Sequence, residues 1–297
     1  MTREAACALA IGGLDPGGGA GLAADLRGFA AAGAFGCMAV ALSTIQSTSG
    51  LRAVNIVPAS RLEEQAAEVL LHQRVRAIKL GALGSASSVR AVGRILAGAP
   101  GVPAVVDTPM LPTRGAARLL TTRAIDVLRR EILPRTTLLT VNANEAQTLV
   151  CHRVQSQADA RAAALELIES GPRAVLVKGG HLNDVDAVDT LVTGGRTFEL
   201  RARRLRVRPV HGAGCVLASL IAGRLAVRPQ ERVDANTLVA AVRWAKRVHH
   251  AALSHPWDVG GALVVLVPTG APRRGLTPRS RTPERMRDGS RPAARPR

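Results

Sequence analysis

The chain has 297 residues, enough for one large α/β domain or two small domains. Hydrophobic residues make up 47% of the chain but aromatic residues only 2%, and tyrosine is absent. This composition favours a parallel sheet covered by helices rich in small residues. It disfavours a protein that stacks nucleic-acid bases on aromatic rings. The formal net charge is +18, of which residues 273–297 contribute +7 through nine arginines and two acids. We interpret the charge as a solvated basic surface, and a nucleic-acid interface is the less favoured alternative.

The cysteines and the hydropathy pattern indicate the compartment. Four cysteines occur, without a Cys-x-x-Cys pair and without the spacing of a zinc site. The sequence shows neither a secretory leader nor an apolar run of about 18 residues that would span a membrane. We therefore expect a cytoplasmic protein with reduced thiols and no membrane partner.

The N-terminal segment predicts a buried strand, a glycine-rich loop and a helix. The apolar run Cys7–Ile11 precedes Asp15–Gly21, where dense glycine allows the backbone to approach a ligand closely. Apolar residues then recur at helical spacing, at Leu22, Leu26 and Phe29. On this helix Asp25 is a candidate acceptor for a substrate hydroxyl or ring amine. The alternative is an unremarkable carboxylate on an exposed helix face.

Further short apolar runs alternate with helical patterns along the chain. The strand candidates are residues 38–43, 77–80, 104–106, 138–141 and 174–177. Repeated βα units predict an α/β fold, a three-layer α/β/α sandwich with a mainly parallel central sheet. Ligands bind such sheets beyond the carboxyl ends of the strands. The polar residues at those ends are Asp15, Gln46, Lys79, Asp107, Asn142 and Lys178.

Two of the strand ends carry motifs suited to nucleotide chemistry. In Asn142-Ala143-Asn144-Glu145 the carboxylate and amide oxygens suit a magnesium shell with retained waters, and the alternative is a polar helix cap. In Lys178-Gly179-Gly180-His181 the lysine can meet nucleotide phosphates as a point charge. A Walker-type P-loop is absent, so a kinase of this sequence would not use one.

The segment His211-Gly212-Ala213-Gly214-Cys215 carries the strongest local signal. A Gly-Ala-Gly turn that opens a helix exposes backbone N–H groups, and the helix dipole adds partial positive charge there. Together they predict an anion hole for a phosphoryl group in transfer. Cys215 at the helix N-terminus is expected to have a lowered pKa and to accept a proton from a substrate hydroxyl. The alternative is a glycine turn with a buried, inert cysteine.

The order of these motifs resembles the hydroxymethylpyrimidine/phosphomethylpyrimidine kinase family, within the ribokinase-like superfamily. The resemblance covers about residues 8–225. It rests on Asp15–Gly21 with Ala24-Asp25-Leu26, on residues 41–46, on Lys79-Leu80-Gly81 and Val106-Asp107-Thr108, on Asn142 with Glu145, and on Lys178–Leu182 with His211–Cys215.

The resemblance implies phosphorylation of 4-amino-5-hydroxymethyl-2-methylpyrimidine and then of its monophosphate, with ATP and Mg²⁺, for thiamine biosynthesis. It also implies a homodimer. Cys215 takes the place of the catalytic base, and Gly212, Ala213 and Gly214 form the anion hole. The implied substrate-binding residues are Gly13, Asp15, Asp25, Gln46, Ala82 and Pro109. The implied nucleotide-binding residues are Asn142, Lys178 and His211, and the implied magnesium-associated residues are Asp107 and Glu145.

Several residues around the expected pocket depart from the family's pattern. Ala213 replaces a threonine, which leaves a backbone anion hole intact, whereas Pro209-Val210 replace Asn-Thr at the nucleotide side. Ala82 replaces a methionine and should widen the pocket, and Pro109 replaces a valine. Two alternatives therefore stay open. One is a kinase for pyridoxal or another hydroxymethyl heterocycle, and the other is a binding or regulatory homologue without turnover.

The composition changes near residue 268. Residues 1–268 are expected to form the kinase domain. Residues 269–297 are rich in arginine, proline and glycine with almost no apolar periodicity, and they predict a disordered tail.

Overall fold

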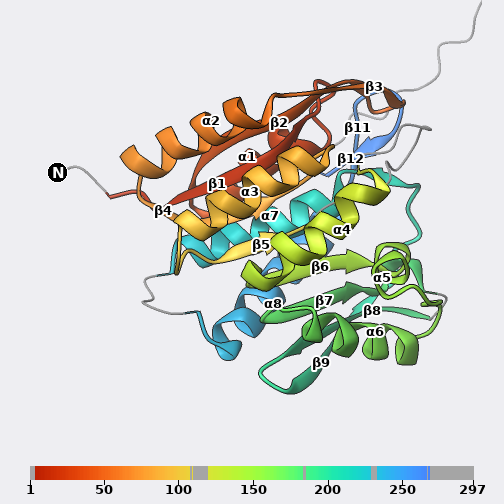
Figure 1. Ribbon diagram of the computed structural model, residues 1–297. Helices are drawn as coiled ribbons and strands as arrows, with labels where there is room; N and C mark the ends of the chain where they lie inside the picture. Colours follow the sequence, from red (N-terminus) through yellow and green to blue (C-terminus); the bar gives the residue numbers. More distant parts are fainter. Residues whose placement is uncertain are drawn as a thin grey trace, which may run out of the picture.

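A nine-stranded sheet forms the centre of the protein (Figure 1) in a computed structural model that describes residues 4–107, 109, 120–182, 185–228, 233–265 and 267. Its strand order is β3-β2-β1-β4-β5-β6-β7-β8-β9. The strands are β1 (Cys7–Leu14), β2 (Phe35–Ser47), β3 (Gly50–Ile56), β4 (Val75–Leu80), β5 (Ala104–Val106), β6 (Leu138–Asn142), β7 (Ala174–Lys178), β8 (Asp186–Thr193) and β9 (Arg196–Arg203). Neighbours from β2 to β7 pair in parallel, whereas β3, β8 and β9 pair antiparallel at the two edges.

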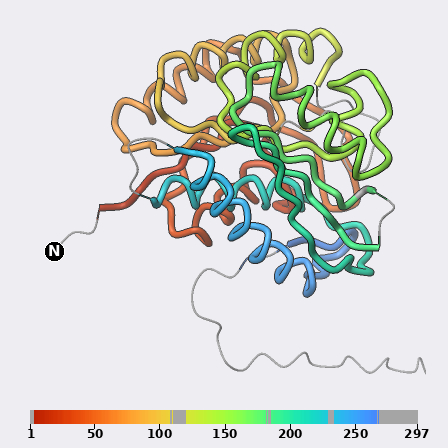
Figure 2. The backbone as a smooth tube through the Cα atoms, turned by 90° about the horizontal axis from the view of Figure 1, so that it is seen from below, coloured from red at the N-terminus to blue at the C-terminus, as the bar shows by residue number. Residues whose placement is uncertain are grey.

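Helices cover both faces of the sheet, which confirms the predicted three layers (Figure 2). One face carries α2 (Ala59–His72), α3 (Ala86–Gly98), α4 (Thr122–Glu131), α5 (Ala143–Val150) and α6 (Gln157–Glu169). The other carries α1 (Gly21–Ala32), α7 (Ala213–Ala226) and α8 (Ala235–Leu253). Two short 3₁₀ helices, Leu133–Arg135 and Gly179–His181, follow α4 and β7.

Small residues decide how closely α1 and α7 approach. A Cβ added at Gly28 would come within 2.6 Å of Ser219 Cβ, and one added at Gly223 within 2.7 Å of Ala32 Cβ. The two helices therefore lie almost backbone to backbone, which larger side chains would prevent. This contact places the start of α7 beside the glycine-rich loop that precedes α1.

Every strand predicted from the sequence is present, but two antiparallel hairpins, β2–β3 and β8–β9, were missed. Strands β8 and β9 pair antiparallel through Gly194 and Gly195, whose φ angles are 56° and 71°. Positive φ at both central residues is the requirement of a two-residue hairpin turn, and a Gly-Gly pair between apolar runs is its sequence signal. The β8–β9 hairpin extends the sheet beyond the parallel strands, and residues of both its strands line the cavity described below.

A second, three-stranded sheet brings the C-terminal part of the described chain over the start of α7. It consists of β10 (Val210–His211), β12 (Leu263–Val264) and β11 (Trp257–Asp258), in that order. The predicted tail, residues 269–297, lies outside the described residues, so the division at residue 268 stays a prediction. No helix of the described chain is both long and apolar enough to cross a membrane.

Candidate active site

A cavity of about 740 Å³ lies at the carboxyl ends of the parallel strands. Parallel strands end at one edge of a sheet, so residues far apart in sequence meet there. All of the residues predicted for the site line this cavity: Gly13, Asp15, Asp25, Gln46, Ala82, Asp107, Pro109, Asn142, Glu145, Lys178, His211, Gly212, Ala213, Gly214 and Cys215.

The first turn of α7 presents backbone donors to the cavity. Gly212 is the N-cap, with φ 78°, and no side chain caps the helix. A Cβ on Gly212 would collide with the carbonyl oxygen of Gly19, so the glycine loop and the helix start require glycine at this contact. The N–H groups of Ala213, Gly214 and Cys215 are the first of the helix, where the dipole is positive. The uncapped N–H groups are consistent with the predicted anion hole, which stays a prediction.

Cys215 lies at this helix start, but its ionisation differs from the prediction. Burial raises the pKa of the thiol to about 11, and the carboxylates of Asp25 and Asp107 add to the effect. The Lys79 ammonium and a hydrogen bond from the Gly21 N–H act in the opposite direction without overcoming it. The expected lowering of the pKa is therefore wrong, because desolvation and the two carboxylates outweigh the Lys79 ammonium and the Gly21 N–H.

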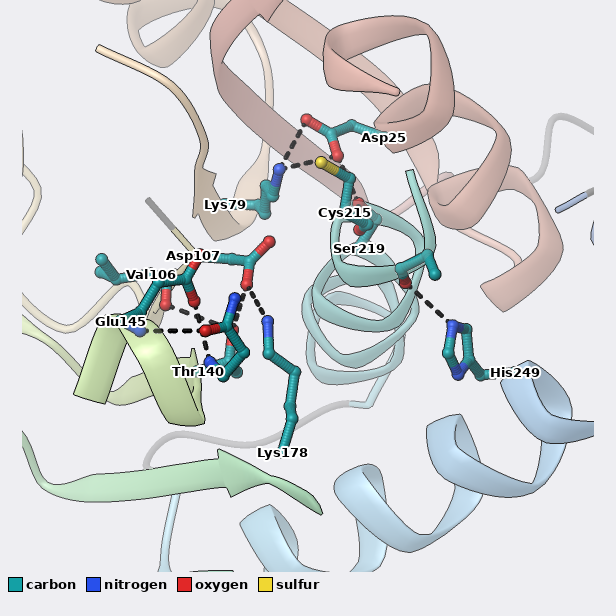
Figure 3. Close-up of polar contacts among 12 residues, drawn as sticks. Asp25, Lys79, Val106, Asp107, Thr140, Glu145, Lys178, Cys215, Ser219 and His249 are labelled. Atoms are coloured by element: carbon teal, nitrogen blue, oxygen red, sulfur yellow. Dashed lines mark hydrogen bonds and ion pairs between the residues drawn. The ribbon is translucent and has the colours of Figure 1, made fainter. Parts of the chain in front are cut away.

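A buried ion pair lies next to Cys215 (Figure 3). Lys79 Nζ is 2.8 Å from Asp25 Oδ1 and 3.0 Å from Oδ2, and Ser219 Oγ donates to Oδ1 at 2.6 Å. Burial opposes the charge on Lys79, but the carboxylates of Asp25 and Asp107 outweigh it and hold the pKa of the lysine above its ordinary value. Asp25 is fully buried, so the alternative of an exposed helix carboxylate is wrong.

A second lysine–carboxylate pair faces the first turn of α7. Lys178 Nζ and Thr140 Oγ1 both donate to Asp107 Oδ1, each at 2.8 Å. Burial works against ionisation of Asp107, but Lys178 and Lys79 outweigh it, so its pKa lies below the ordinary value. A Cβ on Gly214 would sit 3.3 Å from Lys178 Nζ, which shows how closely the lysine approaches the backbone donors.

Asn142 and Glu145 form the helix cap that the sequence offered as the alternative. The Asn142 side chain accepts from the Glu145 N–H at 2.9 Å, and Glu145 Oε2 accepts from the Asn142 N–H at 2.8 Å. Burial raises the pKa of Glu145, against the charge of Lys178. A cap uses one carboxylate oxygen, so it does not exclude a metal role for the other.

The donor set fits magnesium held jointly with phosphates. Within the described residues, Asp107 Oδ2 and Glu145 Oε1 accept no hydrogen bond, and both side chains line the cavity. No cluster of three or more His, Cys, Asp or Glu side chains suited to a metal occurs in that part of the chain. Mg²⁺ is commonly bound through one or two carboxylates with water and substrate phosphates, and two such oxygens suit that arrangement.

The opposite end of the cavity is organised by Asp15. Its carboxylate accepts from the backbone N–H groups of Gly17 and Ala20 and from His211 Nε2, at 2.8, 2.9 and 2.8 Å. Burial raises the pKa of Asp15, but these donors outweigh it and the net shift is downward. The same His211 nitrogen is 3.1 Å from the Gln46 amide, so His211 lies with the predicted substrate-binding residues although it was predicted to contact nucleotide.

Two polar residues of α8 were not found from the sequence. Lys246 Nζ is 2.6 Å from Asp189 Oδ2, and His249 Nε2 is 2.8 Å from the Ala213 carbonyl oxygen. Both side chains line the cavity. Their three-residue spacing places them on one face of the helix, which is the signal that could have found them.

Comparison with known proteins identifies relatives that match most of the chain. A family model, phosphomethylpyrimidine kinase, matches residues 15–266. The chain is 37% identical over 255 residues to a hydroxymethylpyrimidine/phosphomethylpyrimidine kinase of Streptomyces coelicolor, covering 86% of this chain and 91% of the relative.

Solved structures agree with the fold. A phosphomethylpyrimidine kinase from Clostridium difficile superposes with a TM-score of 0.70 at 28% identity, covering 83% of this chain and 99% of that one. Pyridoxal kinase from Staphylococcus aureus, in complex with AMP-PCP and pyridoxal, gives a TM-score of 0.77 at 25% identity over 89% and 93% of the two chains. The predicted ribokinase-like fold is thereby confirmed.

Proposed function

Because the chain belongs to the phosphomethylpyrimidine kinase family, a family of phosphotransferases, we propose that it transfers the γ-phosphoryl group of ATP to 4-amino-5-hydroxymethyl-2-methylpyrimidine and then to the resulting monophosphate, for thiamine biosynthesis. The observation that carries the proposal is the juxtaposition of Cys215, the backbone donors of the α7 start and Lys178 in one cavity. The relatives' activity, and the AMP-PCP bound to the S. aureus neighbour as an ATP analogue, support ATP as donor.

Cys215 acts as the general base in this proposal. The thiolate accepts the proton of the substrate hydroxyl as the hydroxyl oxygen bonds to the γ-phosphorus and the bond from that phosphorus to ADP breaks. The N–H groups contributed by Gly212, Ala213 and Gly214 bind the phosphoryl oxygens as negative charge spreads over them. The thiolate is the minor form wherever the pH lies below the thiol's pKa of about 11, and the Lys79 ammonium is the nearby charge that favours the thiolate.

The two ends of the cavity divide the binding roles. Gly13, Asp15, Gln46, Ala82 and Pro109 are proposed to hold the pyrimidine. His211 was assigned to the nucleotide, but its contacts with Asp15 and Gln46 favour a role at the substrate end. Both oxygens of Asp25 are engaged by Lys79 and Ser219, so Asp25 is proposed to act through Lys79 and not by direct substrate contact.

Asn142, Lys178 and Lys246 are proposed to bind the nucleotide. The closeness of Lys178 to Gly214 as well as to Asp107 supports a contact between this lysine and the transferred phosphate. Asp107 and Glu145 would hold Mg²⁺ through their free oxygens. The ion would neutralise charge on the ATP phosphates.

A coupled assay of ADP release tests the proposal. Purified protein receives ATP and Mg²⁺ with hydroxymethylpyrimidine, with its monophosphate, or with pyridoxal. Release with both pyrimidines is expected, and release with the first alone would restrict the enzyme to one step. Absence of release with every substrate would support the regulatory homologue instead.

Pyridoxal is the second candidate substrate, because the S. aureus neighbour binds pyridoxal in the same fold. Both substrates carry a hydroxymethyl group on a planar ring, so the same base and anion hole would serve them. Turnover of pyridoxal alone would replace the pyrimidine proposal.

Replacing the base should abolish most of the activity. Cys215→Ala removes the only proton acceptor proposed for the substrate hydroxyl, and loss of a general base typically costs about 10²–10⁴-fold in rate. The measurement is kcat with hydroxymethylpyrimidine, with circular dichroism to verify folding. Activity within about tenfold of the parent would rule Cys215 out as the base.

The predicted homodimer and cytoplasmic location complete the proposal. Light scattering during size-exclusion chromatography measures the mass of the assembly directly. A mass near the 31.0 kDa of one chain would contradict the dimer.

A further inference from the structure

His249 reaches from α8 to the first residue of α7. Its Nε2 lies 2.8 Å from the carbonyl oxygen of Ala213, and Figure 3 shows the imidazole pointing at that carbonyl from the opposite helix. The carbonyl can only accept, so the imidazole nitrogen donates and carries a hydrogen. The contact joins α8 directly to the proposed anion hole.

The imidazole is held neutral. Desolvation lowers the pKa of His249 to about 4, against the hydrogen bond to Ala213, and the charges of Lys178 and Lys246 act in the same direction as desolvation. The neutral ring has a single N–H, and the geometry places it on Nε2. The donor is therefore present across the pH range in which a kinase works.

The planarity of the peptide bond links this contact to the reaction. The Ala213 carbonyl and the Gly214 N–H belong to one trans peptide unit and point in opposite directions, since the described chain has no cis peptide bond. The helix already holds this carbonyl, and a second donor adds to that constraint on the direction of the N–H of Gly214, a residue that lines the cavity. A hydrogen bond to the oxygen also polarises the unit and strengthens the N–H as a donor.

Packing alone does not require a histidine at this position. Apolar side chains of the two helices, among them Leu220, Leu238 and Val242, already share one buried cluster. Withdrawing an imidazole from water costs free energy unless its polar atoms are paired, so an aliphatic residue would serve a purely structural contact as well at this partly buried position.

We propose that His249 is a positioning residue, which orients and polarises the Gly214 N–H toward the phosphoryl oxygens of the transition state. The inference rests on the proposed function for its catalytic consequence. Because the donor acts on charge that develops during transfer, its loss should lower kcat more than it changes KM.

Kinetics of matched variants test this role. In His249→Gln the amide nitrogen can occupy the place of Nε2 and donate to the same carbonyl, whereas His249→Leu cannot donate. We expect His249→Leu to lose about tenfold in kcat, less than the loss on deleting an anion-hole donor outright, with KM for the pyrimidine changed by less than about twofold. His249→Gln should recover most of the activity, and His255→Leu, outside the cavity, should match the parent.

An amide resonance tests the hydrogen bond without reference to turnover. In protein labelled with ¹⁵N-glycine, the Gly214 resonance is assigned by its loss in Gly214→Ala. We expect it to move upfield in His249→Leu and to return toward the parent position in His249→Gln. If His249→Leu does not fold, His249→Asn replaces it, because its amide is too short to reach the carbonyl.

The outcomes separate the two proposals. A parent protein without turnover contradicts the proposed function, while the Gly214 resonance still decides whether His249 polarises that peptide. An unmoved resonance overturns the inference. So does an unchanged kcat in His249→Leu, or an equal loss in the glutamine and leucine variants.

Discussion

At the scale of single residues, Cys215 illustrates a competition between a local and a distant effect. A helix N-terminus favours a thiolate, but the elements around the partly buried Cys215 desolvate the thiol, and two carboxylates lie near it. Desolvation is the largest of these effects and raises the pKa of the thiol to about 11. The proposed base is therefore mainly a thiol at neutral pH.

Alkylation of Cys215 should report this ionisation. The thiolate is the reactive form, so the rate of modification by iodoacetamide is expected to rise about tenfold per pH unit between pH 7 and 10. Mass spectrometry of the peptide that contains Cys215 measures it. In Lys79→Met the rate should be lower at each pH, because the favourable charge is gone. A plateau below pH 9 would contradict the raised pKa.

The ion pair behind Cys215 should also matter for stability. Lys79→Met leaves the buried Asp25 without its counter-ion, which typically costs about 3–5 kcal/mol of unfolding free energy. Urea denaturation measures the loss. The double variant Lys79→Met/Asp25→Asn removes both charges and should be more stable than Lys79→Met. Additive losses would show that the pair is not coupled.

At the scale of elements, the glycine loop before α1 and the start of α7 form one unit. Gly212 has a positive φ and no room for a Cβ beside Gly19, so two segments almost 200 positions apart fix each other. The apolar contact between α1 and α7 also holds the glycine loop and the start of α7 together, because each of these two segments leads directly into one of the helices. The anion hole therefore depends on helix packing as well as on its own motif.

A pair of glycine variants separates strain from close contact. At Gly195, φ is 71° and an added Cβ would have no heavy atom within 4 Å. Gly195→Ala should therefore lose only the about 1–2 kcal/mol of unfolding free energy that a left-handed conformation costs an alanine. Gly212→Ala carries the same strain and a collision with Gly19, so it should lose more stability and most of the activity. Thermal unfolding and kcat are compared side by side. Equal effects would argue against the close contact.

At the scale of the whole molecule, the charge is unevenly distributed. Residues 273–297 carry +7 of the net +18, whereas the cavity balances its lysines with buried carboxylates. The proposed chemistry uses the charged side chains of the cavity, and no residue proposed for the site lies among residues 273–297.

Deleting the chain from Arg273 onward should therefore leave kcat and KM unchanged. The reason is that every proposed catalytic and binding residue precedes it. Steady-state kinetics of the truncated and full-length proteins at equal salt give the comparison. A marked rise in KM for ATP would instead assign the basic segment a part in nucleotide capture.

The sequence by itself determined the layers of the sheet, the strand-end residues and the Gly-Ala-Gly-Cys helix start. These depend on local periodicity and on the rule that parallel strands end at one edge, so they can be read without coordinates. The strand-end rule brought Asp15, Gln46, Asp107, Asn142 and Lys178 into the predicted site, and the family resemblance added Gly13, Ala82 and Pro109; all of these line the cavity. Neither source identified Thr140, Ser219, Lys246 and His249.

Only the tertiary structure decided how those residues are partnered. The pairing of Asp25 with Lys79, the raised pKa of Cys215 and the contact of His249 with Ala213 all join elements distant in sequence. Burial and charge at such contacts are set by what packs from every side, and a local pattern contains no information about it.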